Sequence, residues 1–168
     1  VGVLPRGKTS TCEIAALFGH LEVLQWARRA GAPWGLTCEA AAKAGHLEVL
    51  QWAHRAGAPW DRTCERAAKA GRLEVLQWAR GAGAPWGRAR EFAAIAGRLE
   101  VLRWARENGC PWDEATCSAA ASGGHLDVLR WAREAGCEWG VETCNAAASG
   151  GHLEVLQWAR ERGCEWDE

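Results

Sequence analysis

Apolar and polar positions recur along the chain in a block of 26 or 27 residues that is copied six times. In the second copy, the small residues of the first segment fall at positions i, i+3, i+4 and i+7, which share one face of a helix. These residues are Cys38, Ala41, Ala42 and Gly45. A helix with so small a face can approach a neighbouring helix closely. Thr37 is predicted to cap its N-terminus through the side-chain hydroxyl, and Gly45 is predicted to end it in the left-handed conformation.

A second segment, from about His46 to Ala56, has a much broader apolar face and a narrow polar edge. Its apolar residues are Leu47, Val49, Leu50, Trp52, Ala53 and Ala56. Such a face suits a helix packed between two neighbours. Gly57 is predicted to stop this helix, and Pro59 cannot continue it.

The whole chain therefore reads as an all-α solenoid of six stacked helix-turn-helix repeats, in which each repeat contacts its neighbours. No strand-like alternation is present in the sequence. Residues 1–10 are expected to be a lead-in loop or the end of a preceding repeat, and residues 11–168 a single solenoid. The predicted repeats are residues 11–36, 37–62, 63–88, 89–115, 116–142 and 143–168.

Twelve tryptophans occupy two positions of this repeat, one in the second helix and one in the loop after it. They are Trp26, Trp34, Trp52, Trp60, Trp78, Trp86, Trp104, Trp112, Trp131, Trp139, Trp158 and Trp166. Their constancy predicts a structural role in the core, because residues that contact a partner would vary among repeats. A stacking ladder for bases or pigments is the alternative interpretation.

The segment from Ala41 to Leu50, closing at Gly57-Ala58, resembles the core of an ankyrin repeat in its Ala-Ala, Gly-His, Val-Leu and Gly-Ala landmarks. The resemblance extends over all six copies. It implies the ankyrin fold and a protein-binding role, since ankyrin proteins mostly bind proteins. These repeats are shorter than the usual 33 residues. The residues that would build the projecting β-hairpin finger are those that are missing, so the resemblance leaves the binding surface open.

Basic and acidic residues nearly balance over the whole chain, but the first half is basic and the second half is acidic. The formal net charge is −1, whereas residues 1–88 carry 12 basic and 7 acidic residues, net +5, and residues 89–168 carry 8 and 14, net −6. No apolar run is long enough for a membrane span, and no signal peptide is recognisable. Because methionine is absent, we expect a segment of a longer protein, or a mature form after loss of a targeting peptide. The expected location is a reducing compartment, namely cytoplasm, nucleus or an organelle.

The eight cysteines fall in two columns of the repeat, one in the first helix and one in the loop. Equivalent positions in adjacent repeats lie about 10 Å apart, beyond the roughly 7 Å Cα limit for a disulfide. Buried free thiols are therefore expected, with Cys110–Cys117 and Cys137–Cys144 as the pairs that could approach. Zinc-type cysteine spacing is absent, so no metal and no cofactor are predicted.

No catalytic residues are predicted, because the sequence shows no nucleophile–base constellation, paired-carboxylate cleft or phosphate-cradling loop. One column holds His20, His46, His125 and His152 but Arg72 and Arg98 in the other repeats. A position that accepts both residue types is expected to donate a hydrogen bond at the turn between helices. His54 stands alone in an arginine column and is expected to be a solvated surface residue.

The exposed face of the first helix varies most among the repeats and is the predicted partner-binding surface. Its candidate residues are Ile14, Leu17, Phe18, Lys43, Arg66, Lys69, Phe92 and Ile95. Glu39 is predicted to lie on the same exposed face. Phe92 and Ile95 form an apolar patch in the middle of the stack, where a local adjustment of the core is the alternative. In the first repeat, cover by a preceding segment is the alternative.

The predicted function is a non-catalytic protein–protein interaction module, acting as a scaffold or adaptor or as a structural subunit of a large multi-subunit complex. The alternative function is RNA binding by helical repeats through the basic N-terminal half. That half carries Arg28, Arg29, Lys43, Arg66 and Lys69. The balanced net charge and the acidic second half argue against nucleic acid as a partner.

Overall fold

The computed structural model describes residues 10–111 and 113–165, which form twelve helices and no β-strand. The helices of the first three repeats are α1 (Thr11–Leu17), α2 (Leu21–Arg29), α3 (Thr37–Ala44), α4 (Leu47–Arg55), α5 (Thr63–Ala70) and α6 (Leu73–Gly81). Those of the last three are α7 (Ala89–Ile95), α8 (Leu99–Glu107), α9 (Ala115–Ser122), α10 (Leu126–Glu134), α11 (Val141–Ser149) and α12 (Leu153–Glu161). The predicted all-α solenoid is confirmed. Within the described ranges, no helix is long and apolar enough to cross a lipid bilayer.

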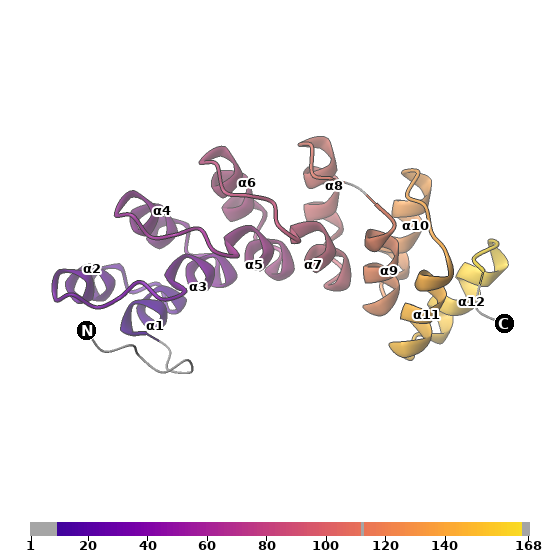
Figure 1. Cartoon of the computed structure of the whole chain (residues 1–168), viewed down its shortest axis with the longest axis horizontal. Coiled ribbons are helices and arrows are strands. Elements are labelled where there is room, and N and C mark those ends of the chain that lie inside the picture. The colour runs from indigo at the N-terminus through magenta and orange to yellow at the C-terminus, as the bar shows by residue number, and fades with distance from the viewer. Residues whose placement is uncertain (1–9, 112, 166–168) are drawn as a thin grey trace.

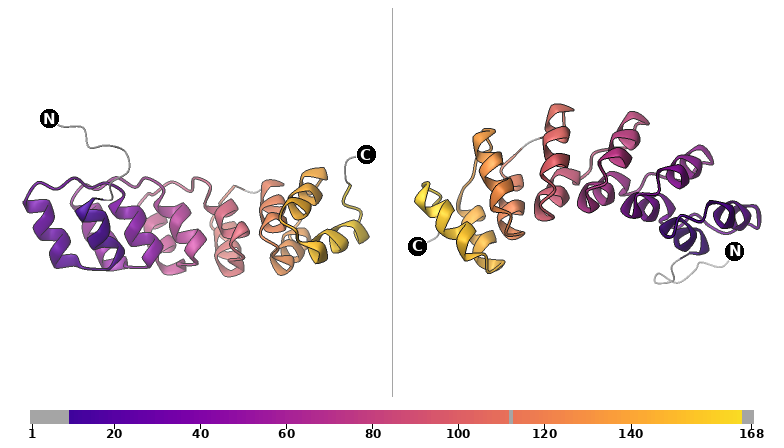
Figure 2. Two further views of the ribbon diagram at one scale, coloured as in Figure 1. Left: turned by 90° about the horizontal axis from the view of Figure 1, so that it is seen from below. Right: turned by 180° about the vertical axis from the view of Figure 1, so that it is seen from behind.

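The helices stand in two rows that follow an arc (Figure 1). The odd-numbered helices line the inner, concave side and the even-numbered helices the outer, convex side. The connections between repeats run along one edge of the stack (Figure 2). This arrangement gives the molecule two long faces of different character, which we call the inner face and the outer face.

Residue size accounts for the arc. The inner helices meet through alanine and cysteine side chains that are fully buried, such as Ala41, Ala67 and Ala93. Neighbouring inner helices are in close backbone contact, while no two outer helices are among the closely contacting pairs of the described chain. The outer helices are separated by larger side chains, including the fully buried Leu50 and Leu76. A short spacing on one side and a longer one on the other bends the stack.

The turn between the two helices of a repeat is tied to the repeat before it. Gly45 ends α3 with φ of 92°, in the left-handed conformation that was predicted. A Cβ atom there would also lie 3.0 Å from the Arg72 side chain of the next repeat. Arg72 Nε donates to the Lys43 carbonyl at 3.5 Å, and Arg98 Nε to the Lys69 carbonyl at 3.1 Å. The predicted donor role is therefore observed, and its acceptor is a carbonyl at the end of the preceding inner helix.

The predicted N-cap role of Thr37 is wrong. The cap position is Leu36, and the Thr37 hydroxyl donates to the Trp34 carbonyl instead of accepting from the helix. Thr63 does the same toward Trp60. These buried hydroxyls therefore fasten the loop tryptophan to the start of the next repeat.

Glu39 was predicted on the exposed face of the first helix, but it is buried, with 6% of its surface exposed. Arg66 of the next repeat covers it and forms an ion pair with Nε 2.8 Å from the carboxylate. Adjacent inner helices therefore lie close enough for a long side chain of one helix to reach the exposed face of the next. Arg66 is consequently less available to a partner than predicted.

The tryptophans pack in pairs between repeats. In four cases a loop tryptophan lies against the helix tryptophan of the following repeat, with ring centroids 5.8 Å apart for Trp34–Trp52 and 5.7 Å for Trp60–Trp78. The corresponding distances are 5.5 Å for Trp86–Trp104 and 5.4 Å for Trp139–Trp158. Trp158 is 9% exposed. The other paired rings are half-buried against the core: Trp34, Trp52, Trp60, Trp78, Trp86, Trp104 and Trp139. Trp131 is half-buried as well.

The placement of Trp26 in the core is wrong, because 68% of its surface is exposed. Its column pairs with a loop tryptophan of the preceding repeat, and no tryptophan precedes Trp26 in the sequence. Trp112 and Trp166, which were also predicted in the core, lie outside the described residues. The tryptophans thus form a half-buried layer of the outer face rather than a uniform core.

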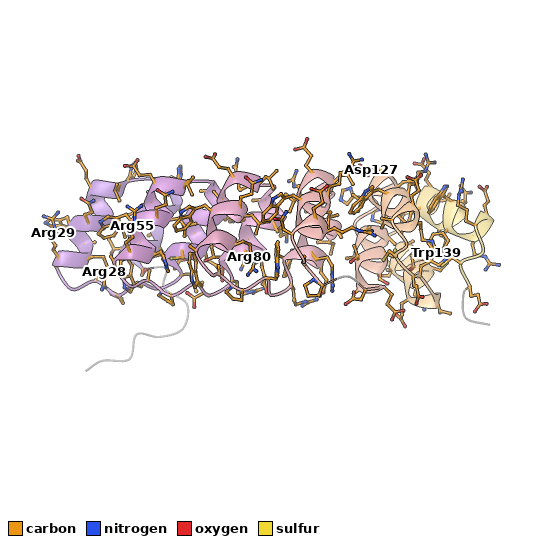
Figure 3. All side chains as sticks on the ribbon, turned by 90° about the horizontal axis from the view of Figure 1, so that it is seen from above. Arg28, Arg29, Arg55, Arg80, Asp127 and Trp139 are labelled. Atoms are coloured by element: carbon orange, nitrogen blue, oxygen red, sulfur yellow. The ribbon has the colours of Figure 1, made fainter. Side chains whose placement is uncertain are left out.

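In three of the repeats, an arginine of the outer helix covers the loop tryptophan of the same repeat. The guanidinium carbon lies 4.1 Å from the Trp34 ring for Arg28, 4.5 Å from Trp86 for Arg80 and 4.2 Å from Trp139 for Arg133. Arg28, Arg80 and Trp139 are labelled in Figure 3. These contacts are cation–π interactions. His54 occupies the same position in the second repeat and stacks on Trp60 at 4.0 Å, so its prediction as a solvated residue is wrong.

We expect Trp26→Ala and Trp78→Ala to differ sharply in their effect on stability. Trp78 packs against Trp60 and His54, so its loss should lower the free energy of unfolding by about 2–3 kcal/mol, less than for a fully buried ring. Trp26 is mostly exposed, so Trp26→Ala should change the free energy of unfolding by less than about 0.5 kcal/mol. Urea denaturation of both variants measures the difference. Equal costs would contradict the paired packing.

Candidate functional site

The inner face contains a groove between α7, α9 and α11, which we call the inner groove. Its volume is about 430 Å³. Phe92 and Ile95 of α7 form one wall. The floor is made of short side chains of α9 and α11: Ala115, Ser118, Ala119, Ser122 and Ala146. Arg88, Glu91, Glu114 and Glu142 complete the rim.

The groove exists because the equivalent exposed positions of the inner helices carry different residues in different repeats. In the second and third repeats they carry long side chains, including Lys43, Arg66 and Lys69. In the fifth and sixth repeats the same columns carry alanine, serine and asparagine. Short side chains beside the bulky Phe92 leave a hollow that polar side chains do not fill. Ile95 keeps 41% of its surface exposed there, which is unusual for a large apolar residue in the middle of a stack.

Three cationic side chains lie close to the Phe92 ring. The ring lies 5.4 Å from Arg62 Cζ, 5.7 Å from Lys69 Nζ and 5.6 Å from Arg88 Cζ. Arg62 and Arg88 are oriented in turn by Glu65 and Glu91, at 2.5 Å and 2.6 Å. The ring is therefore positioned by several groups and presents a defined apolar surface to the groove.

The electrostatics of the groove are asymmetric. Burial pushes the pKa of Glu65 upward, but hydrogen bonds from the Arg88 backbone N–H and the Arg62 guanidinium outweigh it and hold that pKa below its usual range. The α5–α7 side therefore consists of paired charges. On the α9–α11 side, Glu114 and Glu142 are exposed and form no ion pair with any described residue. That rim is open to a cation.

The other predicted apolar candidates lie in the first repeat, away from the groove. Ile14 is 46% exposed, Leu17 36% and Phe18 62%. They form a second apolar area at the end of the inner row. Lys43 and Lys69 are exposed on the inner face, and Arg66 is partly withdrawn by its ion pair with Glu39. The structure thus divides the eight candidates between the groove, the first repeat and the polar stretch that separates them.

The basic residues named for RNA binding do not form one surface. Arg28 and Arg29 belong to α2 in the outer row, and Figure 3 shows them on that side. Lys43, Arg66 and Lys69 belong to the inner helices α3 and α5. Arg28 is also engaged, because its guanidinium covers Trp34 and donates to the Ala32 carbonyl.

All eight cysteines are free and buried. The thiols in contact lie within one repeat, Cys117 with Cys137 and Cys144 with Cys164, rather than across the junctions considered from the sequence. Burial raises the pKa of Cys38 to about 12 and that of Cys64 to about 11. Over the described residues, no group of three or more histidine, cysteine, aspartate or glutamate side chains could hold a metal ion.

We expect the native chain to resist a water-soluble disulfide reagent at pH 8. The attacking species is the thiolate, and burial keeps all eight thiols from the reagent until the repeat opens. For Cys38 and Cys64 the raised pKa slows the reaction further. Each thiol should react at least about 100-fold more slowly than in urea. Following the release of the chromophore checks this. One fast thiol in the native chain would show that a cysteine is exposed.

Comparison with known proteins agrees with this architecture. Residues 38–80 match the family model described as ankyrin repeats (many copies). The crystal structure of the human ASB11 ankyrin repeat domain superimposes with a TM-score of 0.71 at 17% sequence identity, covering 94% of this chain and 85% of that one. No curated protein sequence matches the chain.

These findings confirm the predicted resemblance: residues 38–80 match ankyrin repeats, and the chain has the fold of an ankyrin repeat domain. Ankyrin repeats are generally protein–protein interaction modules and are typically non-catalytic. The comparisons therefore establish the fold of this chain. The particular surface used has to come from the side chains of this chain.

Proposed function

We propose that this chain is a non-catalytic protein-binding module that holds a partner protein in the inner groove. The observation that carries the proposal is the apolar hollow beside Phe92 and Ile95, at positions where the second, third, fifth and sixth repeats carry charged or small residues. Half-exposed large apolar side chains next to a hollow are typical of interaction sites. Two of its three helices, α7 and α9, are packed between inner helices on both sides, which favours a site that is rigid before binding.

The groove suits a protein segment with one large apolar side chain and a neighbouring lysine or arginine. The apolar side chain would pack against Phe92 and over Ala119 and Ala146. The basic side chain would pair with Glu114 and Glu142, which have no partner of their own among the described residues. Apolar burial supplies affinity, and the acidic rim supplies orientation and selectivity.

In the cell, such a module acts as a scaffold or adaptor, or as a structural subunit of a larger assembly. We place it in a reducing compartment, because eight buried free thiols suit surroundings in which disulfides do not form. RNA binding is the competing function, although the separation of the basic residues between two faces gives it no continuous surface.

Affinity capture from the native lysate, with and without nuclease, tests this function. We expect the same protein partners in both samples, and retention that changes little between 50 and 200 mM salt. A partner set lost on nuclease treatment, with retention falling about 10³-fold or more over that salt range, would support the RNA function and refute ours.

A further inference from the structure

The outer face has a second hollow, between α10 and α12, which we call the outer hollow. Its volume is about 660 Å³. Trp139 and Trp158 contribute the aromatic part of its lining. The remaining lining is charged: Arg130, Arg133, Glu134, Glu161 and Arg162. It lies on the opposite side of the stack from the inner groove, so it is a separate site.

Two of its arginines depart from the repeat. Position 130 is glutamine in four of the other repeats and arginine in one, Arg103. Position 162 is otherwise alanine or asparagine, so an arginine stands there in the last repeat alone. Both guanidiniums approach the same indole, since Arg130 Cζ lies 5.7 Å and Arg162 Cζ 4.9 Å from the Trp158 ring. The repeat pattern does not require either residue for packing, because other repeats fold with glutamine and alanine at these positions.

Several hydrogen-bond donors around this hollow have no acceptor. The side chains of Arg130 and Arg162 form no ion pair or hydrogen bond with a described residue. The Trp158 indole Nε1–H is buried and has no acceptor among the described residues. Arg133 differs, because it donates to the Cys137 carbonyl at 2.5 Å. A buried donor without a partner is uncommon in folded proteins and is a reason to look for a bound group.

We propose that the outer hollow binds a carboxylate group. A carboxylate offers two acceptor oxygens in the plane that guanidinium groups recognise, and its charge-assisted hydrogen bonds are strong. The net charge of the lining selects among anions. Three guanidiniums against the carboxylates of Glu134 and Glu161 leave a charge of +1, which matches a monoanion. A phosphate dianion would leave an excess of negative charge.

The carboxylate can come from a small organic acid or from an acidic side chain of a polypeptide. Both present the same group to Arg130 and Arg162. The open hollow admits either, and the probes below separate the two sources. This inference is independent of the inner groove, because none of its residues lines that groove.

The test follows the tryptophan indole N–H signals by ¹H–¹⁵N NMR, with the Trp158 signal assigned from Trp158→Phe. Acetate and the blocked peptide Ac-Gly-Glu-Gly-NH₂ are titrated, with acetamide and Ac-Gly-Gln-Gly-NH₂ as neutral counterparts and inorganic phosphate as the dianion. We expect the Trp158 signal to move saturably with a carboxylate and not with its amide. Saturation by acetate alone assigns a small acid as the source, and tighter binding of the peptide assigns an acidic polypeptide.

The matched variants take their residues from the other repeats. Arg130→Gln with Arg162→Ala should weaken carboxylate binding at least tenfold, while Arg103→Gln, at the equivalent position one repeat earlier, should leave it unchanged. The proposal is overturned if the Trp158 signal does not saturate, if the neutral amides move it equally, if phosphate binds more tightly than acetate, or if the double variant binds as the parent does.

Discussion

A chain carrying Phe92→Ser and Ile95→Lys should fold normally and lose its protein partner. The two side chains form the apolar wall of the inner groove, and Ile95 is 41% exposed. Removing a central apolar anchor and placing a cation in the groove should weaken binding by about 2–4 kcal/mol, roughly 30- to 1,000-fold. Surface plasmon resonance against the captured partner measures the change, and circular dichroism shows that the helices are retained.

The sequence provides a control of the same chemistry. Its other phenylalanine and its other isoleucine are Phe18 and Ile14, which are exposed on the same row of helices in the first repeat. Ile14→Lys with Phe18→Ser therefore makes the same two changes away from the groove. Full binding by this control and loss by the groove variant supports the assignment. The reverse result would move the site to the first repeat.

Leu76→Ala should cost about 3–5 kcal/mol of unfolding free energy. Leu76 lies in α6, near the middle of the stack, and has no exposed surface. Its truncation removes buried apolar contacts and leaves a cavity between the inner and outer rows, and rigid helix packing limits how far the cavity can close. In a solenoid, weakening one central repeat also weakens its interfaces with both neighbours.

Leu153→Ala is the matched control for stability. Leu153 is at the start of α12 and is 64% exposed, so its truncation should change the free energy of unfolding by less than about 0.5 kcal/mol. Urea denaturation followed by circular dichroism compares the two. A cost for Leu76→Ala near that of Leu153→Ala would show that the outer row is not packed as described.

The helices were predictable because their determinants are local. Spacing of apolar residues, small faces such as Ala41-Ala42, and stop signals such as Gly45 act within one repeat and recur in every copy. Six copies of one pattern made the solenoid evident from the sequence. The same small faces explain the close inner row and hence the arc.

Predictions failed where the burial or the contacts of a side chain depend on the neighbouring repeat. Glu39 is buried by Arg66 of the next repeat, and the His54 ring contacts Trp78 of the next repeat as well as Trp60 of its own. Trp26 is exposed because its column depends on a tryptophan in the repeat before it. The periodic pattern shows that the tryptophans are structural neighbours of the core, but not how much of each ring faces solvent.

The candidate site was predictable in part. Phe92 and Ile95 were identifiable as apolar residues at positions that hold charged or small residues in every other repeat except the first. The hollow beside them could not be predicted, because it results from the short side chains of two other helices, for example Ala119 and Ala146, lying next to Phe92 in space. The arginines of the outer hollow were likewise visible in the sequence, but their convergence on Trp158 was not.

One measurement tests the central claim most directly: the isoleucine methyl spectrum of the chain during titration with its captured protein partner. Ile14 and Ile95 are the isoleucines of the sequence, so selective labelling reports on the first repeat and on the inner groove separately. We predict that the Ile95 methyl signal shifts and saturates with the partner while the Ile14 signal stays in place. An unchanged Ile95 signal in the presence of a saturating partner would contradict binding in the inner groove.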